Sequence, residues 1–408
     1  MATQKVTALV GAGITFELTN ASEATTEKLT EAISRNIPLK CIKNILKENW
    51  GNINFEHIMH ILEQISSYNT QIKNSLNSSK TDNPLIANFN KFITYKPEYK
   101  CLFEDNETLL HIDNLVKTIA EKIHEYDCDF PSLQNDWYRN FWNVSKKQLI
   151  WNITTTNYDT TLEQTFGRTK YNDGFKRVKN KKYSRFSPTD FLKRSNMPII
   201  GHLHGCINYG NLPSNDLNNF IDEDTLEDFY QYDNYEKARA NWIPKSPNVI
   251  QANENVIVGP IITGMRKTEK ILPHPYSWYH YNFQKSILEN SSLLIVGYGF
   301  GDSYLNQTME RINQIHGDKK RIVVITYAQS AREIARLADG TINHDAFSFY
   351  CKAFKATTNP LLRFSNDDFF NSKKVIKSDN GNVLVYVHGF REASENHTDE
   401  IINFLNEN

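Results

Sequence analysis

Four short segments of this sequence combine residue types that can hold a phosphate, position a water molecule or move a proton. Two are rich in glycine, which lets backbone N–H groups approach a phosphate closely. The other two carry asparagine, aspartate and histidine, side chains that position water or exchange protons near neutral pH. Each segment directly follows an apolar run. The four segments are Gly11-Ala12-Gly13, Asn157-Tyr158-Asp159, His202-Leu203-His204-Gly205 and the stretch from Gly297 to Asp302.

The apolar runs before these segments predict the strands of a parallel sheet. Runs of roughly four to eight Val, Ile, Leu or aromatic residues, closed by Gly, Asn, Asp or His, are typical of buried strands. They alternate with helical patterns, which favours a doubly wound, Rossmann-like α/β sheet. Ligands bind such sheets at the carboxyl ends of the strands near the switch point, so the four segments are expected to meet in one crevice. The predicted strands end near Val10, Thr156, His202, Val296 and Tyr327.

Each segment, taken alone, also has an ordinary structural interpretation. A glycine pair can close a tight turn without a ligand, and Phe16 stands where the dinucleotide fingerprint GxGxxG has its third glycine. Asn157 and Asp159 can form an Asx turn at a strand end. Two histidines at i and i+2 on a strand point the same way, and both can simply be hydrogen-bonded. No carboxylate or cysteine near them completes a metal site, so no metal is expected.

The motifs of several enzyme classes are missing from the sequence. The glycine-rich stretch after Val296 lacks the Lys-Ser/Thr pair of a P-loop, which argues against ATP or GTP hydrolysis. There is no GxSxG elbow of a serine hydrolase. The five cysteines form no CxxC pair, which argues against a disulfide framework and predicts that the protein has no structural zinc.

Composition indicates a globular chain without an overall affinity for polyanions. The chain has 408 residues, a formal net charge of −1 and 12% aromatic residues. This charge balance argues against a surface built as a whole for nucleic acid or anionic lipid. The basic run 176–182 is predicted to be a solvated loop, so direct nucleic-acid binding is not expected. No apolar stretch reaches the roughly 18 residues of a membrane helix, and a cytoplasmic location is expected.

We predict three parts in the chain. Residues 1–30 and 149–335 form the α/β domain, and residues 31–148 form a mainly helical insertion with apolar side chains at helical spacing. Residues 336–408 form a small C-terminal extension. Its strand NVLVYVHGF would be an unprotected sheet edge unless it were covered, which predicts a homo-oligomer.

In this order, the four segments resemble the motifs of the sirtuin family. The GAG-I-S turn of that family is matched by Gly11 to Thr15, its T-Q-N-I-D by Thr155 to Asp159, and its L-H-G by Leu203 to Gly205. The later glycine-rich strand end, which holds the adenosine side of NAD in the family, is matched by Gly297 to Asp302. The resemblance implies that NAD is bound and consumed.

Two departures from typical sirtuins argue against protein deacylation. The two CxxC pairs of the zinc module are absent, since Cys206 alone follows His204 in that region, and Phe16 to Thr26 replace the G-I-P-D-F-R loop. The remaining features resemble the divergent sirtuin-like domains of bacterial antiphage defence proteins, which hydrolyse NAD. The length resembles the stand-alone type that is encoded beside a HerA-type hexameric ATPase.

The resemblance therefore implies an NAD glycohydrolase that yields nicotinamide and ADP-ribose and depletes NAD in an abortive infection. The alternatives are a sirtuin-type protein deacylase and a non-catalytic scaffold that senses NAD or ADP-ribose. His204 is the expected base, Asn157 positions the ribose or the water, and Asp159 either orients Asn157 or stabilises the developing positive charge. His202 is expected to support its strand end. The expected NAD contacts are Gly11, Ala12, Gly13, Thr15, Thr156, Gly297, Gly299 and Asp302.

Overall fold

The structure is a computed structural model of the chain. It describes residues 4–19, 26–34, 43, 53–77, 107–132, 134–193, 196–213, 228–242, 248–251, 254–264, 267–328, 341–353, 375–378 and 380–407. Parts of the predicted helical insertion, including residues 78–106, and of the predicted C-terminal extension lie outside these ranges. Within the described ranges no helix is long and apolar enough to cross a bilayer.

The chain divides into two compact units, which differ from the predicted domains. The first unit comprises Met1–Thr25, Glu125–Cys206 and Pro275–Asn408, and it carries all four candidate segments. The second comprises Thr26–His124 and Ile207–His274. The predicted C-terminal extension therefore groups with the main sheet, and residues 207–274 group with the helices of the insertion.

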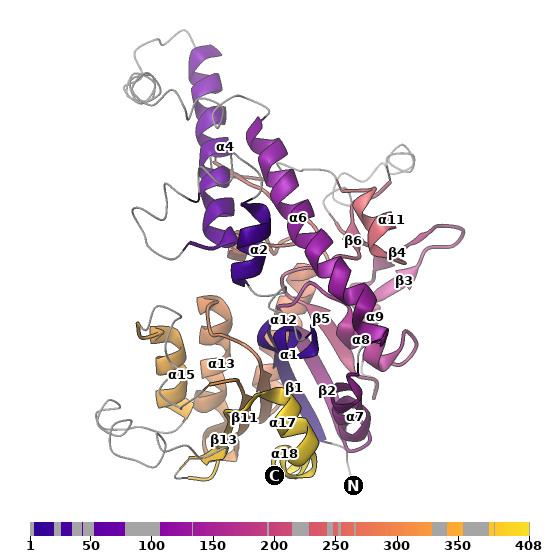
Figure 1. The fold of residues 1–408 in the computed structure, drawn as a ribbon, viewed down its shortest axis with the longest axis vertical. Helices are drawn as coiled ribbons and strands as arrows, with labels where there is room; N and C mark the ends of the chain where they lie inside the picture. The colour runs from indigo at the N-terminus through magenta and orange to yellow at the C-terminus, as the bar shows by residue number, and fades with distance from the viewer. Residues whose placement is uncertain are drawn as a thin grey trace. The chain divides into compact units, whose positions relative to one another are not determined.

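The first unit is built on a seven-stranded α/β sheet, as predicted (Figure 1). The strand order is β12-β13-β11-β10-β1-β2-β5, and every neighbouring pair except β12 with β13 is parallel. The strands are β1 (Gln4–Val10), β2 (Leu149–Thr155), β5 (Ile199–His202), β10 (Ser292–Val296), β11 (Arg321–Ile325), β12 (Val375–Lys377) and β13 (Val383–Tyr386).

The switch point of this sheet lies between β1 and β10. From β1 the chain winds outward through β2 to β5, then crosses to β10 and winds the other way to β13. The predicted strand ends at Val10, His202 and Val296 are confirmed. β2 ends at Thr155, one residue earlier than predicted. β11 ends at Ile325, and Tyr327 instead forms an isolated antiparallel bridge with His388.

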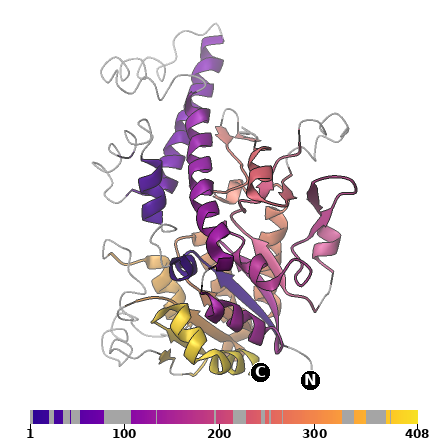
Figure 2. The same ribbon diagram turned by 45° about the vertical axis from the view of Figure 1, so that its right-hand side comes forward.

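Helices cover both faces of the sheet (Figures 1 and 2). Side chains alternate along a strand, so Val6 and Ala8 of β1 belong to one core cluster while Thr7 points to the other face. There, Thr7 Oγ1 accepts a 3.0 Å hydrogen bond from Asn290 Nδ2. One face carries α12 (Tyr276–Glu289) and α13 (Ser303–His316), and the other carries α7 (Asp136–Ser145), α17 (Gly389–Asn396) and α18 (Thr398–Asn406).

Aromatic side chains fasten the second of these faces. Trp142 of α7 packs edge-on against Trp151 of β2, with ring centroids 5.3 Å apart, and Trp151 Nε1 donates to Ser145 Oγ. Phe390 of α17 packs on Phe141 at 4.8 Å. Truncating a buried aromatic residue to alanine typically costs about 3–5 kcal/mol. These aromatic contacts therefore contribute strongly to holding α7 and α17 on this face of the sheet.

The C-terminal strands complete the sheet, and α17 binds the first helix. β12 covers the outer edge of β13, so β13 is not the exposed edge on which the prediction of self-association was based. The carboxylate of Glu17, in α1 (Gly13–Thr19), accepts hydrogen bonds from the backbone N of Phe390 at 2.8 Å and of Arg391 at 2.7 Å. Burial raises the pKa of Glu17 although these bonds favour its charged form.

The second unit contains α2 (Thr26–Ile33), α4 (Phe55–Asn77) and most of α6 (Glu107–Asp129). The predicted apolar stripe of α4 is confirmed, since Ile58 and Leu62 are fully buried. A buried ion pair joins Lys270 to Glu63 at 2.5 Å, and burial lowers the pKa of Lys270. The unit also holds a short antiparallel pair, β6 (Tyr209–Gly210) with β7 (Tyr230–Tyr232).

Candidate functional site

The two glycine-rich segments pack against each other at the switch point. Gly11 N donates to Val296 O and Gly13 N donates to Gly297 O, each at 2.8 Å. A Cβ atom at Gly11 would lie 2.7 Å from Gly297 O, and one at Gly13 would lie 2.9 Å from Gly297 Cα. The sequence predicted that these glycines admit a pyrophosphate. The structure shows that the packing of one turn on the other already requires them.

Gly297→Ala is expected to destabilise the fold, whereas Gly299→Ala is not. Gly297 has φ of +61°, and its Cβ would lie 2.5 Å from Ile14 N, whereas a Cβ at Gly299 would meet nothing within 4 Å. The strained conformation alone costs roughly 1–3 kcal/mol. Urea denaturation followed by circular dichroism measures both variants, and equal midpoints for the two would contradict this account of the turn.

Asn157 is held at the carboxyl end of β2 by three hydrogen bonds that its two nitrogen atoms donate. Its backbone N donates to Thr155 Oγ1 at 3.0 Å, and its Nδ2 donates to Thr15 Oγ1 at 3.1 Å and to Gly11 O at 3.3 Å. A carbonyl oxygen can only accept, so the orientation of the amide is fixed. Asn157 Oδ1 is buried and has no hydrogen-bond partner among the described residues.

Asp159 reaches Asn157 through Thr15. Its Oδ2 accepts from Thr15 Oγ1 at 3.2 Å and from the hydroxyl of Tyr126 at 3.1 Å, and its Oδ1 accepts from the N and Oγ1 of Thr161. The single hydroxyl proton of Thr15 therefore goes to Asp159, which leaves the Thr15 oxygen to accept from Asn157. Of its two predicted roles, orientation of Asn157 is the one that these contacts support.

A second buried carboxyl group lies beside Asp159. Asp127 accepts hydrogen bonds from the N and Oγ1 of Thr160, at 2.7 and 2.8 Å, at the start of α8 (Thr161–Phe166). Burial and then the charge of Asp159 raise the pKa of Asp127 to about 7. Sequence reasoning missed this residue, because it comes from the end of α6.

His202 binds the backbone of Asn157 directly. Its Nδ1 lies 3.0 Å from Asn157 O and its Nε2 lies 2.6 Å from Glu163 Oε1. Both partners are acceptors, so the ring carries a proton on each nitrogen. Burial opposes this charged form, but the charge and hydrogen bond of Glu163 and the Asn157 carbonyl outweigh it and raise the pKa of His202 to about 9. His202 thus supports Asn157 itself in addition to its strand end.

His204 meets the second glycine-rich segment at Asp302. Its Nε2 lies 3.1 Å from Asp302 Oδ2, while Asp302 Oδ1 accepts from the N of Tyr304 and Leu305 and caps α13. A carboxylate only accepts, so Nε2 carries the proton and Nδ1 is the proton-accepting nitrogen of His204. The sequence placed Asp302 against NAD. The structure shows that it also contacts His204, and the contact with NAD stays a prediction.

His280 was not recognised in the sequence. It lies on α12, and its Nε2 donates to Leu203 O at 3.1 Å, between the two histidines of the HLHG segment. Burial, assisted by the nearby His204, lowers the pKa of His280 to about 4, so the ring is neutral at neutral pH. Its Nδ1 is buried without a hydrogen-bond partner in the described part of the chain.

The remaining predicted contacts lie at the same edge of the sheet. Thr156 N donates to Val10 O at 3.0 Å, and Thr15 lies on α1 directly after the glycine turn. Ala12 and Gly299 are exposed, and a Cβ at Gly301 would also meet nothing within 4 Å. The backbone around Gly299 and Gly301 is therefore open to a ligand. Gly13 is exposed as well, although a Cβ there would meet Gly297, whereas Gly11 is buried.

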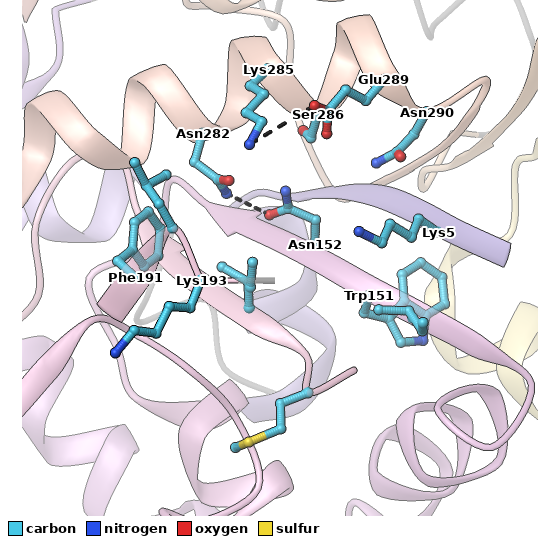
Figure 3. Close-up of a pocket in the computed structure, with 14 residues that line it drawn as sticks. Lys5, Trp151, Asn152, Phe191, Lys193, Asn282, Lys285, Ser286, Glu289 and Asn290 are labelled. Atoms are coloured by element: carbon cyan, nitrogen blue, oxygen red, sulfur yellow. Dashed lines mark hydrogen bonds and ion pairs between the residues drawn. The ribbon is translucent and has the colours of Figure 1, made fainter. Parts of the chain in front are cut away.

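One pocket lies toward the opposite, amino ends of the strands (Figure 3). Lys5, Asn152 and Ile199 contribute to it from β1, β2 and β5, and Asn282 and Lys285 from α12. Asn282 Nδ2 donates to Asn152 Oδ1 at 2.8 Å. None of the predicted site residues lines this pocket. Separately, within the described ranges no three His, Cys, Asp or Glu residues are grouped so that they could hold a metal ion.

Comparison with known families agrees with this geometry. Residues 152–347 match the family model of the SIR2-like domain. No curated protein matches the chain. The matched range starts in β2 and omits Gly11 to Gly13, which β1 places between β2 and β10. Residues 152–347, just under half of the chain, are therefore similar to a SIR2-like domain, and they contribute β2, β5, β10 and β11 to the Rossmann-like sheet.

Proposed function

We propose that this chain is an NAD glycohydrolase that cleaves NAD to nicotinamide and ADP-ribose. The observation that carries the proposal is the state of Asn157 Oδ1. The protein binds the backbone N and O and the Nδ2 of this residue, and it leaves one buried acceptor unsatisfied. Leaving such a group unpaired costs about 1–3 kcal/mol, which a ribose hydroxyl or a water molecule would recover by donating to it.

The chemistry divides between Asn157 and His204. Loss of nicotinamide breaks the bond between its ring nitrogen and the ribose, and the positively charged ring leaves as a neutral molecule. The ribose carbon becomes oxocarbenium-like, as in glycoside cleavage. A water molecule, or a ribose hydroxyl, then attacks and loses a proton. Asn157 Oδ1 orients the attacking group, and His204 Nδ1 takes the proton.

The open glycine backbone supports binding of the rest of NAD. Gly299 and Gly301 have free space where a side chain would stand, and they follow β10 at the switch point. Phosphates and ribose approach backbone N–H groups at such places in doubly wound sheets. Gly11, Gly13 and Gly297 support the site indirectly, because they bring β1 and β10 together.

Hydrolysis is favoured over deacylation by the sequence around Cys206. Typical sirtuins carry a zinc module with two CxxC pairs that shapes the groove for the acylated peptide, and this chain has no CxxC pair. A scaffold without catalysis is disfavoured because Asn157 and His204 are both present and each is oriented by a dedicated carboxylate, Asp159 through Thr15 and Asp302 directly.

Incubation of the purified chain with NAD, with and without an acetyl-lysine peptide, tests the proposal. Chromatography is expected to show nicotinamide and ADP-ribose in equal amounts whether or not the peptide is present. Nicotinamide released only with the peptide, together with acetyl-ADP-ribose, would instead identify a deacylase. A rise in melting temperature with NAD, but no nicotinamide, would identify the scaffold.

The resemblance also predicts the biological setting. Depletion of NAD in antiphage defence, a homo-oligomer and a HerA-type hexameric ATPase partner remain predictions.

A further inference from the structure

The strongest concentration of charge in the chain lies on the hairpin of β3 (Phe175–Arg177) and β4 (Tyr183–Phe186), here named the basic hairpin (Figure 1). Residues 168–185 hold eight Lys or Arg residues against a single acidic residue, Asp173, whereas the whole chain has a formal net charge of −1. The rest of the molecule is therefore acidic, and this segment is a local exception.

The pairing of the two strands places like charges side by side. Lys176 stands directly opposite Arg185 in the antiparallel register. Like charges in this position destabilise a sheet, so they do not serve the stability of the hairpin. Asp190 relieves one of them, because its carboxylate binds Lys176 at 2.6 Å and also Lys193. These two lysines hold the pKa of Asp190 well below its usual range.

Three exposed cations on the hairpin make no ion pair with any described residue. They are Lys179 and Lys182 in the turn and Arg185 on β4. The surface they form has no exposed large apolar side chain. Protein interfaces are depleted in lysine and enriched in aromatic residues, whereas nucleic-acid interfaces are polar and strongly positive. The partner that suits this surface is therefore a polyphosphate rather than a protein.

The hairpin is anchored firmly enough to present these charges together. Phe186 packs on Phe175, Phe191 and Tyr279, with ring centroids 5.4 to 5.6 Å apart. Tyr279 of α12 donates its hydroxyl to Asp173 O at 2.8 Å. Beyond Asp190, Lys193 lines the pocket of Figure 3 together with Lys5, Lys285 and the acidic Glu289.

We propose that the basic hairpin is a docking surface for the phosphate backbone of nucleic acid. The sequence favoured a solvated loop for this run, because most short charge runs are solvated. The opposed like charges, the three unpaired cations and the aromatic anchor favour a contact instead. This proposal is independent of NAD cleavage.

Fluorescence anisotropy with labelled duplex and single-stranded DNA of about 20 nucleotides tests the proposal at about 50 and 200 mM salt. Lys179→Gln, Lys182→Gln and Arg185→Gln are combined in one variant. If all three contact phosphates, this variant should lower the slope of log affinity against log salt by about 2.7. The control combines Arg311→Gln, Lys319→Gln and Lys377→Gln. These three side chains are exposed and make no ion pair with any described residue, and their loss changes the net charge equally. It is expected to keep the wild-type slope.

Three results would overturn the proposal: no DNA binding at low salt, equal losses in both triple variants, or polyglutamate competing as well as DNA. The last result would assign the surface to an acidic protein. All six side chains are exposed, so both variants should keep the wild-type unfolding midpoint. If the unfolding midpoint of the triple variant is shifted, Arg185→Gln is tested alone. This single variant should lower the slope of log affinity against log salt by about 0.9.

Discussion

His204→Ala is expected to reduce the rate of NAD cleavage by about 10²- to 10⁴-fold, the usual loss when a positioned general base is removed. Asn157→Ala should cause a comparable loss, because it removes the acceptor that orients the attacking group. Asn157→Asp distinguishes the role of the Oδ1 acceptor from that of the Nδ2 donor. It keeps an oxygen in the place of Oδ1 but puts a second oxygen against Gly11 O and Thr15 Oγ1, so it should also be impaired. Initial rates of nicotinamide release measure all three variants.

The fold should survive His204→Ala, because Asp302 Oδ1 still caps α13 through Tyr304 and Leu305. The unfolding midpoint of each variant provides this control. His316→Ala is a matched histidine control, since His316 contacts Ile287 O at the far end of α13. If His204→Ala retained near-normal turnover, the mechanism proposed here would be wrong whatever the fold.

The sequence predicted the sheet and its ligand-binding edge, because both depend on local patterns. Apolar runs closed by Gly, Asn or His placed the ends of β1, β2, β5 and β10 to within one residue. The same reasoning treated NVLVYVHGF as part of an appended unit. The local sequence of a strand does not indicate which strands it pairs with when these lie far away along the chain. Here the strand is β13, which pairs with β11 on one side and β12 on the other.

The supporting carboxylates could not be predicted for a related reason. Glu163, Asp127 and Tyr126 lie on helices, where ordinary polar spacing explains them equally well. Only the tertiary contacts show that Glu163 binds His202 and that Tyr126 binds Asp159. Asp302 was predicted to contact NAD because it ends a glycine-rich segment. That contact stays a prediction, but the motif alone did not reveal its bonds to His204 and to the first turn of α13. Short motifs identify the residues at a site and say little about which of them contact the ligand.

His202→Ala is expected to destabilise the first unit by roughly 3–5 kcal/mol, the usual cost of breaking a buried ion pair from one side. The sequence predicted a smaller effect on activity than for His204→Ala, on the view that His202 supports its strand end. The structure changes that expectation, because His202 also holds the backbone carbonyl of Asn157. Activity and stability should therefore fall together in this variant. His204→Ala breaks a buried pair with Asp302 and should lower stability as well, but there activity falls because the base itself is lost and not because Asn157 loses a contact.

The pH dependence of stability tests the same contact without an activity assay. The folded pKa of His202, about 9, lies above its ordinary value of 6.5. The stabilisation is therefore complete below about pH 6.5 and is lost as the pH rises through 9, a change of roughly 3 kcal/mol. Asp127, whose folded pKa of about 7 lies above its ordinary value of 3.8, destabilises the fold as the pH rises from about 4 to 7, mostly below the range in which the His202 contribution is lost. The difference between wild type and His202→Ala isolates the histidine.

Urea denaturation between pH 6 and 9.5 measures this difference, and it should shrink steadily across the range. The double variant His202→Ala with Glu163→Ala also removes the Glu163 carboxylate, which the single variant leaves buried without its histidine partner. It is expected to recover part of the stability but not the NAD cleavage, because the Asn157 carbonyl remains without its donor. If the stability of His202→Ala matched that of wild type at pH 6.5, the charged His202 ring would not stabilise the fold through Glu163 and the Asn157 carbonyl, contrary to the inference made here. Full recovery of cleavage in the double variant would show instead that Glu163, and not the bond to Asn157, accounts for the loss.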